Sequence, residues 1–393
     1  MGHVFDDKKR TYQAPADETE STYHWLDRSA LEMAAAARDE LERLYDQYPD
    51  PHRRLLANLR AEEGRDADNA FFGAFASLVL YDRWVRRGYR ITVDEAIGGH
   101  ERRPDMQLMT DSGPIVVEVG VLCTKSDWAE REWCNGQLVD AINAGVRVEG
   151  WLLGIDIDGG LPDGCPHEEV VAAVQDAVDA LPSPREVSSE YENLPRCYLR
   201  HPRADSSLEL TFFPLEDVDN GPDELGFIDD RVIGVGPGNG GCPDTERRVR
   251  NKLRSKHPAR YPPRYVDDKP YVIALAGTDA FMQRKSVGRS LYGDESLVLP
   301  SADATEGWRV LRKGLFGPSP DGAPKQSRIS GVLWVEHLGK ELWYPGSIRL
   351  AYFPNPFSKV PVDASLLGID DELLLEPQAD GRYLLKWRSG EQW

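Results

Sequence analysis

The sequence has few cysteines, and they are scattered. Five cysteines occur in 393 residues, and no two of them form a CxxC pair; they are Cys123, Cys134, Cys165, Cys197 and Cys242. An odd, dispersed set argues against a disulfide framework and a cysteine-rich zinc site, and it is typical of free thiols in a reducing compartment. Cys165-Pro166-His167 has the residue types of half a metal site, but no second pair at ligand spacing accompanies it. We therefore expect a cytoplasmic protein.

The chain also lacks an excess of positive charge and long apolar runs. It has 47 basic and 66 acidic residues, for a formal net charge of −19. Such a chain has no general attraction to polyanions, so any nucleic-acid contact has to come from a local basic patch. No apolar run approaches the length of a membrane span, so we expect no membrane partner. The glycine-rich stretch 234–241 is not followed by Gly-Lys-Ser/Thr, which argues against a phosphate-binding Walker loop.

The most informative stretch is residues 100–122. Residues 106–110 alternate in hydropathy, Asp111-Ser112-Gly113 is a turn signal, and residues 114–122 have the composition of a buried strand. Asp105 begins the first strand and Glu118 lies inside the second, so a hairpin brings both carboxylates to one end. A lone Glu among valines is costly to bury unless it is paired or bound to a cation. The pattern therefore predicts a site for a divalent ion.

Helices are predicted on both sides of this hairpin. Residues 69–88 form an almost wholly apolar helix, and residues 126–144 form a second helix that is followed by a strand at 150–157. Upstream, residues 23–48 and 51–60 have the spacing of amphipathic helices. The order is therefore helix, hairpin, Glu-bearing strand, helix, strand.

This order and its residues resemble the PD-(D/E)XK nuclease superfamily, whose fold is restriction-endonuclease-like, and in particular a branch of uncharacterised bacterial proteins. The residues that carry the resemblance are Phe71-Phe72, Leu78, Gly88-Tyr89, Arg103-Pro104-Asp105 and Val117-Glu118-Val119, with a weaker continuation at Lys256, Tyr261, residues 270–274 and residues 291–293. The core motif covers about a quarter of the chain. The resemblance implies Mg²⁺ (or Mn²⁺) bound by Asp105, Glu118 and the carbonyl of Val119, and DNA as the partner.

The sequence departs from the superfamily pattern at one catalytic position. The pattern places a lysine two residues after the Glu, and this chain has Gly120 there. Lys125 and Lys256 are the candidate replacements, and Lys256 is preferred because the weaker resemblance also places a lysine there. An exposed lysine at a helix entry is the alternative interpretation of Lys125. The helix glutamate that many members carry is also missing, and Ser77 and Asp82 are its nearest equivalents.

A strongly basic helix is predicted near residue 250. It carries six candidate nucleic-acid-binding residues in a chain that is acidic overall: Arg247, Arg248, Arg250, Lys252, Arg254 and Arg260. Only Val249 and Leu253 form an apolar stripe, so the helix is expected on the surface. A DNA-backbone contact and a solvated helix paired with acidic neighbours are both open interpretations.

These observations define the expected architecture. We expect an α/β protein with a restriction-endonuclease-like mixed-sheet core (αβββαβ), comprising a helical region at 1–65, the core at 66–215 and a C-terminal α/β extension at 216–393. The expected function is a metal-dependent DNA endonuclease in restriction or anti-phage defence, with homodimerisation open. The alternatives are a catalytically inactive member that binds nucleic acid or supports an assembly, and an unrelated protein that merely contains a Pro-Asp hairpin.

Overall fold

The computed structural model describes most of the chain. Its description leaves out residues 1–3, 15, 62–65, 96–102, 123–128, 160, 163, 188–190, 203, 215–232, 236–244, 279–282, 294, 299–306, 311–313, 318–325, 378–382 and 389–393. Across the remainder, no helix is both long enough and apolar enough to cross a membrane. The chain is a mixed α/β protein, as the sequence predicts.

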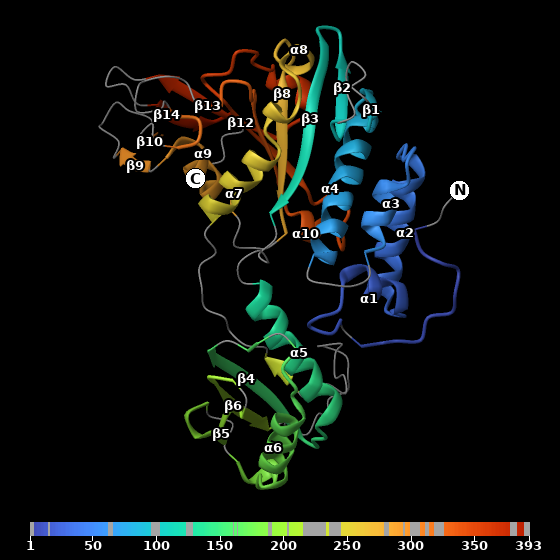
Figure 1. Ribbon diagram of the computed structural model, residues 1–393, viewed down its shortest axis with the longest axis vertical. Coiled ribbons are helices and arrows are strands. Elements are labelled where there is room, and N and C mark those ends of the chain that lie inside the picture. The colour runs from blue at the N-terminus through green and yellow to red at the C-terminus, as the bar shows by residue number, and fades with distance from the viewer. Residues whose placement is uncertain are drawn as a thin grey trace.

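A ten-stranded mixed sheet is the larger of the two sheets (Figure 1). Its strands, in spatial order, are β1 (Arg90–Val93), β2 (Met106–Thr110), β3 (Gly113–Leu122), β8 (Tyr271–Gly277), β11 (Gly331–Glu336), β12 (Arg349–Pro354), β13 (Asp371–Pro377), β14 (Tyr383–Trp387), β10 (Gly307–Val310) and β9 (Glu295–Val298). The first three strands are antiparallel, and β3, β8 and β11 are mutually parallel. The neighbouring strands β3 and β8, inside the sheet, are buried nearly throughout, which suits strands covered on both faces.

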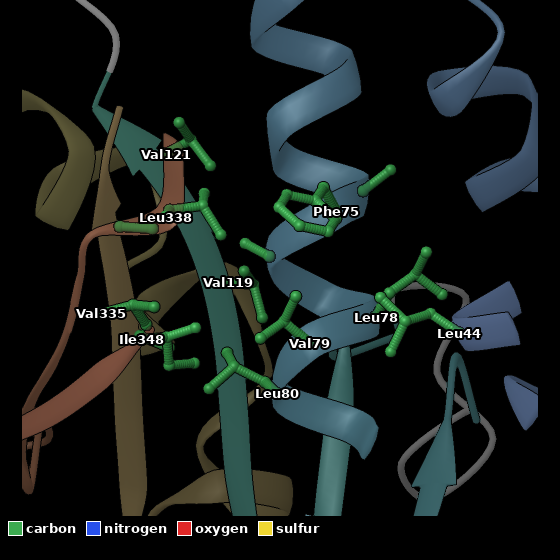
Figure 2. Close-up of a cluster of buried hydrophobic side chains, with 14 of the residues drawn as sticks. Leu44, Phe75, Leu78, Val79, Leu80, Val119, Val121, Val335, Leu338 and Ile348 are labelled. Atoms are coloured by element: carbon green, nitrogen blue, oxygen red, sulfur yellow. The ribbon is translucent and has the colours of Figure 1, made fainter. Parts of the chain in front are cut away.

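Helix α4 (Ala67–Arg86) covers one face of this sheet. Its apolar residues pack against the alternate residues of β3 that point to the same side, and Figure 2 shows Phe75 and Val79 beside Val119 and Val121. Helices α1 (Thr22–Arg28), α2 (Glu32–Gln47) and α3 (Arg54–Leu59) pack beside α4. The short helix α10 (Leu338–Glu341) contributes Leu338 to the same core.

A different set of helices covers the other face. Helices α7 (Thr245–Ser255) and α9 (Arg284–Tyr292) pack together, and α7 also contacts β3. The buried Val249 and Leu253 of α7 join a core that includes Val116 and Leu122 of β3. Because side chains alternate along a strand, Val116, Glu118, Gly120 and Leu122 all point towards α7. A short helix α8 (Pro263–Val266) and a 3₁₀ turn (Pro258–Arg260) connect α7 to β8.

A second, smaller sheet forms a separate lobe, drawn in green in Figure 1. Its strands are ordered β5 (Arg196–Arg200), β6 (Ser206–Pro214), β4 (Trp151–Gly159) and β7 (Ile233–Val235), and its helices are α5 (Ala129–Gly145) and α6 (Glu168–Asp179). The lobe has its own apolar core. The N-terminal segment reaches it, because the Thr19 hydroxyl and the backbone N–H groups of Glu18 and Thr19 donate to the Asp140 carboxylate of α5.

The helix and strand that come next after the hairpin in the sequence do not pack beside β3. The expected helix and strand at 126–144 and 150–157 correspond to α5 and β4, but both lie in the small lobe. The pair beside β3 is α7 and β8. Strand β8 is buried along its whole length, whereas Asp156 and Asp158 of β4 are exposed, so β8 suits the covered centre and β4 a sheet with a solvated face. The strand pairing thus divides the chain differently from the expected ranges 66–215 and 216–393.

Replacing Phe75 with alanine tests the packing of α4 on the sheet. The Phe75 side chain is fully buried, so its loss is expected to reduce the free energy of unfolding by about 3–5 kcal/mol. Urea-induced unfolding measures the change. Met33→Ala on α2, where the side chain is 42% exposed, is the control and is expected to change stability by less than about 0.5 kcal/mol. Equal effects of the two substitutions would contradict the packing.

Candidate functional site

The register of the first hairpin brings Asp105 and Glu118 together. Thr110 pairs with Gly113 and Met106 pairs with Val117, so the next positions along the two strands are Asp105 and Glu118. Residues that are directly opposite in an antiparallel pair point to the same face with their Cβ atoms about 5 Å apart. The tight turn at Asp111-Ser112 therefore sets the position of both carboxylates. The sequence prediction that they lie at one end of the hairpin is confirmed.

Strand β3 is longer than its neighbour β2, so beyond Val117 one edge of β3 has no pairing with β2. Strand β2 pairs with β3 only as far as Val117, whereas β8 pairs with β3 up to Leu122. The backbone N–H of Val119 donates to Asp105 Oδ2 at 2.7 Å, so the aspartate replaces the missing strand partner. The open edge of β3 and the carboxylate that caps it form the floor of the site.

Lys256 supplies the positive charge that the two carboxylates require. Its Nζ lies 2.8 Å from Asp105 Oδ2 and 2.9 Å from Glu118 Oε2. The Glu118 side chain is only 4% exposed, and that of Lys256 is 22% exposed. Lys256 directly follows α7, and its backbone N–H continues the helix by donating to the Lys252 carbonyl. The structure therefore brings together Asp105, Glu118 and Lys256, three residues that sequence reasoning had selected.

Two tyrosines complete the surroundings of this triad. The hydroxyl of Tyr261 donates to Glu118 Oε1, the oxygen that Lys256 does not contact. The hydroxyl of Tyr271 donates to the Lys256 carbonyl at 2.8 Å. Both tyrosines are buried, and burial raises the pKa of each hydroxyl, with the Glu118 charge adding to the effect, so both remain proton donors at neutral pH. Sequence reasoning assigned neither of them a role, because isolated tyrosines carry no spacing signal.

The pKa values of the triad reflect competition between burial and charge. Burial and the neighbouring Asp105 charge raise the pKa of Glu118 to about 7, against the opposing effects of Lys256 and Tyr261. Burial alone would lower the pKa of Lys256, but the two carboxylates outweigh it and its pKa is raised. Lys256 is therefore a stable cation, while Glu118 is poised between its charged and neutral forms.

Gly120 explains how a lysine from another element reaches Glu118. A Cβ atom at this position would lie 2.9 Å from Lys252 Cγ and 3.0 Å from Lys252 Cδ. The stem of Lys252 thus lies across the backbone at the position where the superfamily pattern has its lysine. Because Gly120 has no side chain, α7 can approach β3 closely enough for Lys256, one turn further along, to contact the carboxylates.

The triad lies in a half-open cleft of about 680 Å³, between α3 and α4 on one side and the segment 256–261 on the other. Ser77 of α4 lines the cleft, but its hydroxyl donates to the Gly73 carbonyl. Asp82, the other expected equivalent of the helix glutamate, instead forms ion pairs with Arg43 and Arg86. Neither residue contributes a third carboxylate to the triad.

The six predicted nucleic-acid-binding residues lie on or near α7. Arg247, Arg250, Arg254 and Arg260 are exposed, and Arg248 and Lys252 are half-buried. Arg260 also lines the cleft. Lys125 lies outside the described residues, so its predicted role stays a prediction.

The carboxylate pair fits a divalent cation by its chemistry. Asp105 Oδ2 and Glu118 Oε2 converge on one cationic atom, the Lys256 ammonium, and burial with like charge raises the pKa of Glu118. Oxygen donors of this kind are those that Mg²⁺ and Mn²⁺ prefer. Within the described ranges, no group of three or more His, Cys, Asp or Glu side chains could hold a metal ion. A cation here would therefore depend on two side chains, with backbone oxygen and water completing its coordination.

No family model, curated protein or solved structure matches the chain.

Substituting Gly120 with alanine tests the close approach of α7. The added methyl group must displace the Lys252 stem, so the free energy of unfolding is expected to fall by about 1–3 kcal/mol. Lys252→Ala removes the clash, so the two substitutions are expected to couple by about 0.5 kcal/mol or more in a double-mutant cycle. Strict additivity in urea unfolding would contradict the proposed contact. Gly73→Ala, where a Cβ meets nothing within 4 Å, is the control.

Stability is expected to depend on pH through Glu118. Its folded-state pKa of about 7 lies above the unfolded-state value of 4.5, so the unfolded chain releases this proton first as the pH rises. The contribution to the free energy of unfolding is therefore lost between pH 4.5 and about 7. Glu118→Gln in EDTA is expected to lose less stability than wild type as the pH rises across that window, because the amide does not titrate. The exposed Glu149→Gln serves as the control, and a difference from wild type that does not vary with pH would contradict the assignment.

Proposed function

We propose that the chain is a metal-dependent endonuclease that hydrolyses the phosphodiester bonds of DNA, in line with its resemblance to the PD-(D/E)XK superfamily. The observation that carries the proposal is the contact of Lys256 Nζ with both carboxylates, at 2.8 Å and 2.9 Å. Lys256 lies 138 residues from Glu118 along the chain, and it is the lysine at which the weaker part of the family resemblance also places one. A role in restriction or anti-phage defence is part of the proposal.

The arrangement of elements supports the same proposal. Helix α4, the β1–β2–β3 meander, α7 and β8 follow one another in the order αβββαβ, with the green lobe inserted between β3 and α7. In this interpretation the core motif is complete, and its second half comes from residues 245–277 instead of residues 129–159. The lysine is then displaced from β3 to the end of the core helix.

The residues that would hold Mg²⁺ or Mn²⁺ are Asp105 and Glu118, together with the carbonyl of Val119, a residue that lines the cleft. When bound, the ion supplies polarisation of the scissile phosphate and eases deprotonation of the attacking water. The burial of Glu118 favours binding of the ion, because a buried carboxylate with a raised pKa is stabilised in its charged form when a second cation lies beside it.

The chain's own residues would stabilise the developing charge and orient the groups of the site. The Lys256 ammonium would stabilise the negative charge that develops on the phosphate, because it remains protonated at neutral pH. Tyr261 holds Glu118 Oε1 and fixes the orientation of that carboxylate. Tyr271 holds the backbone of Lys256 and so limits the positions that its side chain can take.

The alternative, an inactive nucleic-acid-binding member of the same fold, rests on Gly120 in place of the motif lysine and on the missing helix glutamate. The Lys256 contacts favour the enzyme over this alternative. The two hypotheses still make different predictions for hydrolysis, so a cleavage assay separates them.

Plasmid and linear DNA incubated with Mg²⁺ or Mn²⁺ are expected to be cleaved by wild-type protein. Asp105→Asn and Glu118→Gln are expected to abolish cleavage, and Lys256→Ala is expected to slow it by about 10²–10³-fold because it removes one charge-stabilising donor. Gel analysis of the products measures the rates.

Two controls accompany this assay. Asp268→Asn changes an exposed aspartate outside the cleft and is expected to leave cleavage unchanged. Calorimetric titration with Mn²⁺ is expected to detect binding to wild type and to Asp268→Asn, but not to Asp105→Ala. Cleavage that survives in both carboxylate variants would overturn the proposal, and metal binding without any cleavage would favour the inactive alternative.

A further inference from the structure

The exposed face of α7 carries a row of arginines that the triad does not use. Arg247, Arg250 and Arg254 are spaced three and four residues apart, which places them along one face of the helix, and all three are exposed. Val249 and Leu253 are buried against the sheet on another face. From Arg247 to Arg254 the row spans seven residue-to-residue steps, or about 10 Å of helix axis.

A second hollow lies where this row ends. It has a volume of about 480 Å³ and is lined by Arg254, His257, Ala259, Arg260 and Gln326. Arg260 lines both this hollow and the cleft that contains Asp105 and Glu118. One short segment, residues 254–261, therefore borders the hollow with Arg254 and His257 and borders the cleft with Lys256 and Tyr261.

The local charge favours an anion despite the net charge of −19. The C-terminal end of a helix is a negative pole that repels phosphate. Here the Arg260 guanidinium donates to the Ser255 carbonyl at 2.7 Å and so offsets that pole. Nearby, Arg328 and Asp267 form an ion pair that contributes no net charge. The described lining of the hollow thus contains two arginines, Arg254 and Arg260, and no carboxylate.

We propose that the arginine row of α7, the hollow at its end and Arg260 form a continuous track that binds the phosphate backbone of the DNA strand flanking the cleft. Guanidinium groups suit this role, because each can bind a phosphate through two parallel N–H donors. The identity of the ligand rests on the proposed function, but binding along the track requires no hydrolysis.

The test measures binding of a fluorescein-labelled 30-base-pair DNA duplex in EDTA by fluorescence anisotropy at several salt concentrations. The variant Arg250→Ala/Arg254→Ala is expected to bind at least about tenfold more weakly at low salt and to lower the slope of log K against log salt by about 2, one unit for each lost phosphate contact. The matched control is Arg196→Ala/Arg200→Ala, which removes two arginines from the exposed face of β5 in the other lobe and is expected to bind as wild type. Single-stranded DNA and RNA of the same sequence form parallel arms.

The outcomes separate the track from the nuclease. Weaker binding of the α7 variant, together with wild-type binding of the β5 control, supports the track whether or not Mg²⁺ produces cleavage. Unchanged binding and salt slope in the α7 variant, an equal loss in the β5 control, or no binding of the DNA duplex by wild type would each overturn it. Cleavage by wild type, together with unchanged DNA binding by the α7 variant, would support the nuclease and contradict the track. Tighter binding of RNA than of DNA would overturn DNA as the ligand.

Discussion

The ion pair of Lys256 with Asp105 and Glu118 is the interaction on which the rest of the site depends. A buried carboxylate beside a second one is unstable without a cation, and removal of one partner from a buried ion pair costs several kcal/mol because the remaining charge is left unpaired. The ion pair also joins the residue that directly follows α7 to both strands of the hairpin. The positions of the arginine row, the hollow and Tyr261 all follow from the placement of α7 that this pair secures.

Much of the hairpin could be predicted from the sequence because its information is local. The turn at Asp111-Ser112 and the alternation along residues 106–122 fix the register, and the register fixes the positions of Asp105 and Glu118. Helix α4 was equally readable, because its apolar residues cover most of its circumference. The choice of Lys256 came from the family resemblance and not from spacing, since no local pattern links it to Glu118.

The parts that could not be predicted depend on contacts between distant segments. The run 126–157 has the expected helix and strand, but whether they join the first sheet or start another depends on competition with α7 and β8 for the edge of β3. Strand β8 occupies the position beside β3 because it has no charged residue and can be buried along its whole length. Strand β4 carries Asp156 and Asp158, which are exposed in the small lobe. The role of Gly120 could not be predicted either. The sequence alone shows only that no lysine is present at this position, whereas the structure shows that the Lys252 stem occupies the space beside Gly120.

The small lobe has a consequence for the way the molecule assembles. Glu118 and Lys256 lie 138 residues apart, and the lobe fills most of the interval between β3 and α7. Closing a flexible loop of that length costs entropy that grows with the logarithm of its length. If the lobe folds first on its own core, the effective length of the loop that must close between Glu118 and Lys256 is shorter. In that order of events, the rate at which Glu118 and Lys256 meet depends on residues of the lobe, none of which is among the described residues that line the cleft.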